Sequence, residues 1–128
     1  LHFTIGNQAI ELLHLQEARY EDRNYAIMMG LKWPDGEMES KSLSVNVVKQ
    51  AFNLMPGQFF VKNWSESFDV MLYAALVDEG IIIPTGLTFP TGYVRAPICF
   101  LGQPGIDLLV FPSQMVINDS YYHGQQTR

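Results

Sequence analysis

Cysteine is nearly absent from this 128-residue chain, in which Cys99 stands alone. A single cysteine excludes a disulfide within the chain, so we expect a reducing compartment and a cytoplasmic protein. Long apolar runs are missing as well, because none approaches the ~20 residues that a membrane-spanning helix needs. We therefore expect no association with a membrane.

Positive charge is also scarce. Lys and Arg together number 8 and Asp and Glu number 13, which gives a formal net charge of -5. Because a protein that neutralises nucleic-acid phosphates needs the opposite balance, we expect no direct nucleic-acid binding. Hydrophobic residues make up 48% of the chain, which favours a packed core over disorder. The length suits a single domain.

Motifs for catalysis and for metal binding are missing too. The three histidines have no partner at metal-ligand spacing, and HExxH, CxxC and GxSxG patterns do not occur. Cys99 lies between two apolar residues, which favours a buried, inert thiol. We therefore expect a protein that is not an enzyme and that holds neither a metal nor another cofactor.

The first residues allow two interpretations. Gly6-Asn7 suits a tight turn, which favours a β-hairpin that pairs Phe3–Ile5 with Ile10–Leu15. Asn7 is also a helix cap for a helix to about Arg19. The apolar residues of this segment form no clean helical stripe, so we prefer the hairpin.

A second hairpin follows. Alternation over Tyr25–Trp33 predicts a half-buried strand, and Pro34-Asp35-Gly36 predicts the turn after it. The return segment, Glu37–Val47, begins polar and alternates again only in its second half. We therefore expect a hairpin with a projecting polar tip, on which Glu37 and Glu39 are solvated.

One main helix is predicted between Asn63 and Gly80. Asn63 caps it with Glu66 three residues on, and Gly80 ends it in the left-handed conformation. Asp69 lies early enough to favour the positive end of the helix. The apolar stripe consists of Phe68, Met71, Leu72, Ala75 and Leu76. A short strand, Gln58–Lys62, precedes this helix.

Strands dominate the rest of the chain. Two Pro-Thr-Gly turns lie at residues 84–86 and 90–92, and Tyr93–Leu101 reads as a strand with Pro97 at an edge or a bulge. Ile106–Phe111 is strand-like, and the following Pro-Ser pair breaks it. The prediction is an α+β fold, an antiparallel β-sheet with one main helix packed on a face. Residues 1–117 form a single domain, and residues 118–128 form a polar C-terminal tail.

Two groups of residues are candidates for binding. Trp64 lies at the predicted helix start between Lys62 and Glu66, and it is either an exposed contact residue or a staple that holds the helix on the sheet. The same two interpretations apply to Trp33 at its turn. The second group consists of Thr91, Tyr93 and Arg95. With the backbone N–H groups of the Pro-Thr-Gly turns, this group suits a phosphate or carboxylate, although Pro-Thr-Gly is also a good turn in its own right.

Several motifs occur in a familiar order: LSVNV at residues 43–47, FVKNWSE at 60–66, ALVDEGI at 75–81 and PTGYVRAP at 90–97. They resemble a family of small proteins from bacteria, their phages and plasmids, in which LTVNLP, VKxWSEN and TGxxxxTGFVxxPV segments follow one another. The resemblance covers about residues 25–101 and departs from the family at Val48, where the family has Pro, and at Ser67, where it has Asn. It implies an accessory protein of a mobile element, with no catalytic residues to transfer.

These observations favour a non-catalytic binding or regulatory protein that inhibits a host or competing-element protein. Its partner is a protein or a second copy, and its contact surface consists of Trp64 with the polar hairpin tip. The alternative is a small-molecule or nucleotide-binding protein that uses the Pro-Thr-Gly turns and Arg95.

Overall fold

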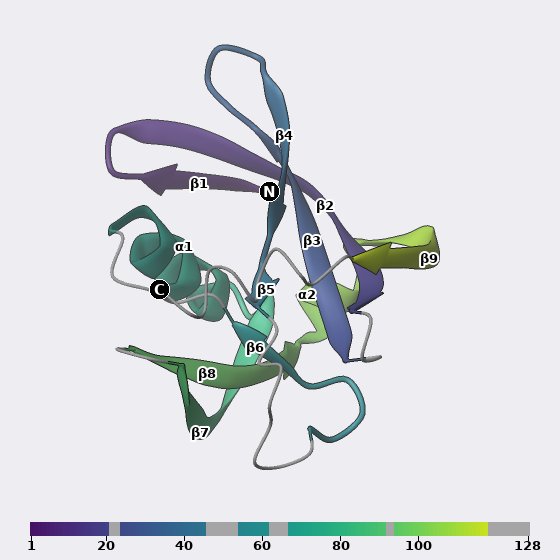
Figure 1. Ribbon diagram of the computed structural model, residues 1–128. Coiled ribbons are helices and arrows are strands. Elements are labelled where there is room, and N and C mark those ends of the chain that lie inside the picture. The colour runs from purple at the N-terminus through teal and green to yellow at the C-terminus, as the bar shows by residue number, and fades with distance from the viewer. Residues whose placement is uncertain (21–23, 46–53, 62–66, 92–93, 118–128) are drawn as a thin grey trace.

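The computed structural model describes residues 1–20, 24–45, 54–61, 67–91 and 94–117 (Figure 1). The strands are β1 (His2–Ile5), β2 (Gln8–Tyr20), β3 (Tyr25–Lys32), β4 (Met38–Ser42), β5 (Ser44–Val45), β6 (Phe59–Val61), β7 (Ile82–Thr91), β8 (Val94–Leu101) and β9 (Leu109–Ile117). The helices are α1 (Ser67–Asp78) and α2 (Gln103–Ile106). None of the helices in these ranges has the length and hydropathy of a membrane span.

The first sheet is built around the long strand β2. Its order is β1-β2-β3-β4, and β9 pairs with the second half of β2. The predicted N-terminal hairpin is confirmed, because Phe3 pairs with Ile10 and Gly6 takes a left-handed φ of 62° at the turn. The alternative N-terminal helix is wrong. β9 runs parallel to β2, whereas the other neighbours in this sheet are antiparallel.

The second sheet has the order β5-β6-β8-β7, with antiparallel neighbours throughout. Of the predicted α+β fold, the mainly antiparallel β-sheet is confirmed, but the strands form two sheets where one was expected. The chain changes sheets between β4 and β5. There the buried Ser44 hydroxyl bonds the Tyr20 hydroxyl at 2.7 Å and accepts the Ile27 backbone N–H at 3.0 Å. These bonds satisfy a polar side chain that the change of sheet buries.

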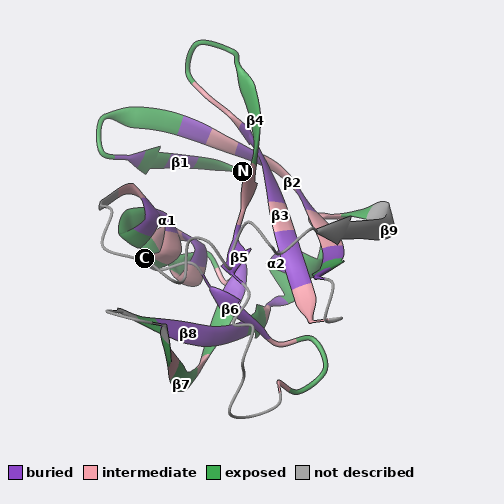
Figure 2. Ribbon diagram, viewed as in Figure 1, coloured by how far each residue is buried: buried purple, intermediate pink, exposed green. Residues whose placement is uncertain are grey.

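The core lies on both faces of β3. Ile27, Met29 and Leu31 join the larger apolar cluster, as the alternation predicts. The expectation of a half-buried strand is wrong, however, because Ala26 on the opposite face is also buried, in a second cluster with Phe60 of β6. Figure 2 shows the buried middle of β3 and the exposed hairpin turn beyond its end. The tip of this hairpin projects as predicted.

The helix α1 brings Leu72 and Leu76 into the larger cluster, as its stripe predicts. Gly80 ends it with φ at 74°, also as predicted. Met71 departs from the prediction, because its side chain is exposed on the edge of that stripe. The predicted cap, Asn63, lies outside the described residues.

The segment after α1 differs from the prediction in two places. The first Pro-Thr-Gly group forms a bulge inside the continuous strand β7, because Pro84 pairs with Cys99 and Thr88 pairs with Pro97. Pro97 pairs with Thr88, the first residue after this bulge, so it borders the irregular part of the ladder. The proline at 112 does not end β9. The pairing with β2 shifts register between Val110 and Met115, so the proline falls where the ladder is already irregular.

The short helix α2 lies where a turn and the start of a strand were predicted. It follows Gly102 and contains Gly105, and both glycines allow very close backbone approaches. A Cβ on Gly102 would lie 2.1 Å from the Gly80 carbonyl oxygen, and one on Gly105 would lie 2.3 Å from the Ile81 carbonyl oxygen. The two glycines therefore let α2 sit directly against the chain that leaves α1.

Candidate functional site

Few of the predicted binding residues lie in the part of the chain that the structure describes. Lys62, Trp64, Glu66 and Tyr93 lie outside the described residues, as does the predicted tail at 118–128. The Thr91 backbone ends β7, opposite Val94. The binding roles of these residues stay predictions.

Arg95 is exposed on the hairpin formed by β7 and β8. Its Nε donates to the Thr88 hydroxyl at 2.6 Å, and its Nη2 donates to the Thr88 carbonyl at 3.4 Å. In the first Pro-Thr-Gly group, the Thr85 hydroxyl accepts the Leu87 N–H at 3.1 Å and donates to the Ile98 carbonyl at 2.9 Å. The Arg95 guanidinium and the hydroxyls of Thr85 and Thr88 therefore bond within the hairpin itself.

The hairpin between β3 and β4 ends in a tightly bonded turn. The Trp33 N–H donates to the Glu37 carbonyl at 2.8 Å, and the Gly36 N–H donates to the Trp33 carbonyl at 2.9 Å. The Asp35 carboxylate accepts the Glu37 N–H at 2.9 Å, and Gly36 has a left-handed φ of 89°. Pro34-Asp35-Gly36 forms the turn for the reasons the sequence suggests.

A shallow hollow of about 580 Å³ lies beside this turn. We call it the tip face, and its lining residues are Asn7, Gln8, Trp33, Pro34, Asp35, Glu37 and Glu39. The N-terminal hairpin thus supplies one wall and the second hairpin supplies the rest. The indole N–H of Trp33 donates to Glu39 at 2.8 Å, which holds the ring beside the carboxylates.

The tip face carries negative charge without compensation from within the described chain. Asp35, Glu37 and Glu39 are exposed, and the described residues place no cation within ion-pair distance of them. The nearest basic residue along β4, Lys41, pairs instead with Asp69 of α1 at 3.6 Å. The tip face therefore combines an aromatic ring with three exposed carboxylates that form no ion pair with the described residues.

Residues in the first turn of α1 pack against the tip face and its hairpin. The Phe68 ring packs against Trp33 with a centroid distance of 5.5 Å, and the Lys41 ammonium lies 5.4 Å from the centre of the Phe68 ring. Asp69 is only 4% exposed, whereas Lys41 is 23% exposed. This set of contacts joins the first turn of α1 to the hairpin and fixes the position of Trp33.

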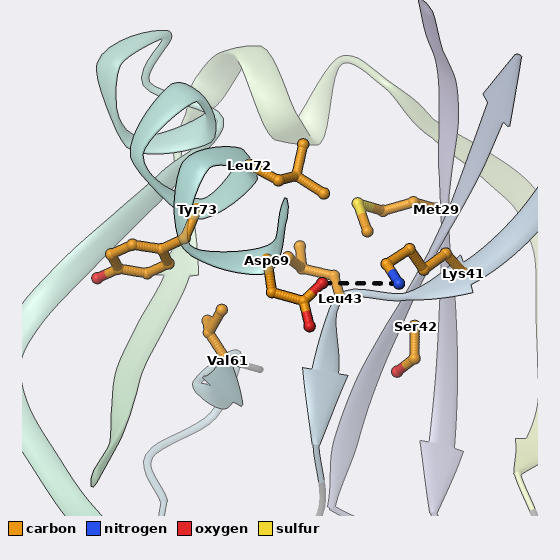
Figure 3. Close-up of a pocket in the computed structure, with 8 residues that line it drawn as sticks. All are labelled: Met29, Lys41, Ser42, Leu43, Val61, Asp69, Leu72 and Tyr73. Carbon is orange, nitrogen blue, oxygen red and sulfur yellow. Dashed lines mark ion pairs between the residues drawn. The ribbon is translucent and has the colours of Figure 1, made fainter. Parts of the chain in front are cut away.

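Figure 3 shows the Lys41–Asp69 ion pair in a small cavity between α1 and β4. The cavity measures about 10 Å³, which is room for roughly one water molecule. One carboxylate oxygen of Asp69, Oδ2, has no hydrogen-bond partner among the described residues. The small volume indicates a structural junction, because no organic ligand fits there.

Cys99 is buried, as predicted, and its Sγ lies 3.9 Å from the Tyr73 hydroxyl. Burial raises the pKa of the Cys99 thiol to about 11 and, with the neighbouring thiol, raises the pKa of Tyr73 to about 12. Both groups are therefore protonated at neutral pH, and the thiol is a poor nucleophile. The described residues contain no group of three or more His, Cys, Asp or Glu side chains that could hold a metal ion.

Comparison of the chain with protein families, curated proteins and solved structures finds no match. Sequence reasoning identified Trp33 and the glutamates of the tip separately. It missed their assembly with Asn7 and Gln8, because these residues belong to a different hairpin.

Proposed function

We propose that this chain is a non-catalytic binding and regulatory protein that recognises a basic segment of a partner protein through the tip face. The observation that carries the proposal is the combination of Trp33 with three exposed carboxylates that lack ion-pair partners among the described residues. A Lys or Arg side chain is the natural complement of both features.

The electrostatics favour a basic partner in two ways. At short range, an ammonium or guanidinium group gains attraction from the carboxylates and from the face of the indole ring. At long range, the net charge of -5 speeds the encounter with a positively charged surface. Two tip faces repel each other for the same reason, so a second copy of this chain is a poor partner for this surface.

The rigidity of the tip face supports the same proposal. The indole N–H of Trp33 bonds Glu39 and the ring packs against Phe68, so little conformational entropy remains to be lost when a partner binds. We propose in addition that α1, as the main helix, packs on one face of the first sheet and keeps the hairpin in place. The contacts of Leu72 and Leu76 with the larger cluster support this role.

We propose the wider setting that the sequence suggests. The chain is an accessory protein of a bacterium or mobile element, and it acts in the cytoplasm on a host or competing-element protein. Small-molecule binding by Arg95 and the Pro-Thr-Gly turns has less support. The Arg95 guanidinium already bonds Thr88, and the Thr85 hydroxyl already bonds its own bulge.

A fluorescence titration tests the proposal. The chain has two tryptophans, and Trp64 is itself a candidate contact residue, so it is kept. The part of the fluorescence signal that is lost in a Trp33→Phe variant belongs to Trp33 and reports on the tip face. We expect a Lys-rich peptide to change its fluorescence to saturation, with an affinity that weakens as salt is added. The same peptide with acetylated lysines is the control and should bind much more weakly. Equal binding of the two peptides would overturn the proposal.

A further inference from the structure

A second hollow lies near the opposite end of β2 from the tip face. It measures about 550 Å³ and is lined by Glu17, Tyr25, Met55, Pro56, Gly57, Gln58, Phe100, Leu101, Ile106 and Leu109. We call it the apolar pocket. Its volume lies in the range of about 300–1,000 Å³ that is typical of small-molecule sites.

The walls of the apolar pocket present hydrophobic side chains to solvent. Met55 is 66% exposed, Ile106 is 48% exposed and Phe100 is 39% exposed. They come from three separate segments: the turn before β6, the end of α2 and the strand β8. Exposed apolar side chains that converge on one concavity are typical of a binding site.

One carboxylate lies among these apolar walls. Glu17 accepts a hydrogen bond from the Tyr25 hydroxyl, and Glu17 has no ion-pair partner among the described residues. The nearby Arg19 places its guanidinium 5.0 Å from the centre of the Tyr25 ring and forms no ion pair with Glu17. Because an ionised carboxylate accepts several hydrogen bonds, Glu17 keeps free acceptor capacity toward the pocket.

We propose that the apolar pocket binds a small organic amine, whose aliphatic or aromatic body packs on Met55, Phe100 and Ile106 and whose ammonium group bonds Glu17. A neutral apolar ligand would remove water from the carboxylate without replacing its hydrogen bonds. An anion would be repelled. A protonated amine satisfies the carboxylate and the apolar walls together.

This inference is independent of the proposed function of the tip face. The tip face involves Gln8 at the start of β2, whereas the apolar pocket involves Glu17 near its end. Either site can fail its test without affecting the other.

Calorimetric titration of the full chain with phenethylamine tests the inference, with 2-phenylethanol and methylamine as matched probes. For a ligand of this size we expect a dissociation constant of about 1 mM for phenethylamine. The alcohol keeps the ring without the charge, and methylamine keeps the charge without the ring, so each should bind about tenfold more weakly or not at all.

The variant Glu17→Gln should weaken phenethylamine binding by about tenfold, and the control Glu79→Gln, at the exposed end of α1, should leave it unchanged. Met55→Ser provides a second test at a mostly exposed side chain, where a loss of fold is not expected, and it should also weaken binding. The inference is overturned if the alcohol or methylamine binds as well as phenethylamine. It is also overturned if folded Glu17→Gln keeps full affinity, or if Met55→Ser does.

Discussion

Two groups of acidic side chains lie close to the same hairpin and differ in almost every physical respect. Asp69 is 4% exposed and pairs with Lys41 beneath the hairpin. Asp35, Glu37 and Glu39 are exposed on the tip face and have no ion-pair partner among the described residues. The buried carboxylate holds α1 against β4, whereas the exposed carboxylates are available to a partner.

Burial decides whether a charged side chain of this hairpin serves stability or recognition. A buried charge is tolerated only with a counter-charge, so removing its partner is strongly destabilising. Exposed charges contribute little to stability, and like charges placed together oppose it slightly. On the tip face, Asp35 accepts the Glu37 N–H of the turn and Glu39 accepts the indole N–H of Trp33. None of the three exposed carboxylates forms an ion pair with the described residues, so their charge is left for a partner.

The largest effect is expected for Lys41→Met. It leaves the Asp69 carboxylate buried without an ion-pair partner among the described residues, so the free energy of unfolding should fall by about 3 kcal/mol. Urea denaturation at neutral pH measures the change. Lys32→Met is the matched control on β3 and should change stability by less than about 0.5 kcal/mol. Equal stability of the two variants would contradict a structural role for the ion pair.

A smaller effect is expected for Asp69→Asn. This variant leaves Lys41 unpaired, but the partly exposed ammonium can turn toward water, so the loss should be about 1 kcal/mol. The double variant Lys41→Met/Asp69→Asn removes both charges of this ion pair. Its loss should therefore be clearly less than the sum of the two single losses. Additive losses in this double-mutant cycle would show that the two side chains do not interact.

The buried thiol of Cys99 in β8 makes the stability of the fold depend on pH. The pKa of Cys99 is about 11 in the folded protein, above its ordinary value of 9.0, because burial disfavours the thiolate. The stabilisation is therefore complete below pH 9 and is lost as the pH rises toward 11, since the unfolded chain releases the proton first. The melting temperature should fall over this interval, and it should fall less in Cys99→Ser. An identical fall in both proteins would exclude Cys99 as a source.

The smallest effect on stability is expected at the tip face. Glu37→Gln should change the free energy of unfolding by less than about 0.5 kcal/mol, because this side chain is exposed and unpaired among the described residues. The same variant should weaken the binding of a Lys-rich peptide severalfold, as measured by Trp33 fluorescence. A marked loss of stability would show that Glu37 serves folding, which would remove the contrast with Asp69.

Local sequence patterns predicted much of the chain. The turn at Gly6, the strand that begins at Tyr25, the turn at Asp35 and the end of α1 at Gly80 all follow from neighbouring residues. Each depends on a left-handed glycine, on turn chemistry or on an alternating pattern, which are properties of a few adjacent side chains.

The same local patterns could not predict which strands pair when they are distant in sequence. The parallel contact of β9 with β2 and the division into two sheets depend on segments that are distant in sequence. Asp69 was predicted only as a charge that favours the positive end of the helix. Its ion pair was missed, because Lys41 lies 28 positions earlier and is brought close only by the fold. The tip face has the same origin, since Asn7 and Trp33 meet across two hairpins.

The most direct test of the central claim is an amide chemical-shift titration of the ¹⁵N-labelled protein with a Lys-rich peptide. We expect the largest shifts at the indole N–H of Trp33, at the backbone amides of residues 35–39 and at Asn7 and Gln8. We expect no comparable shifts around Arg95. Saturable shifts at the tip face would support recognition of a basic partner there. Shifts confined to the hairpin of β7 and β8, with Trp33 unchanged, would contradict it.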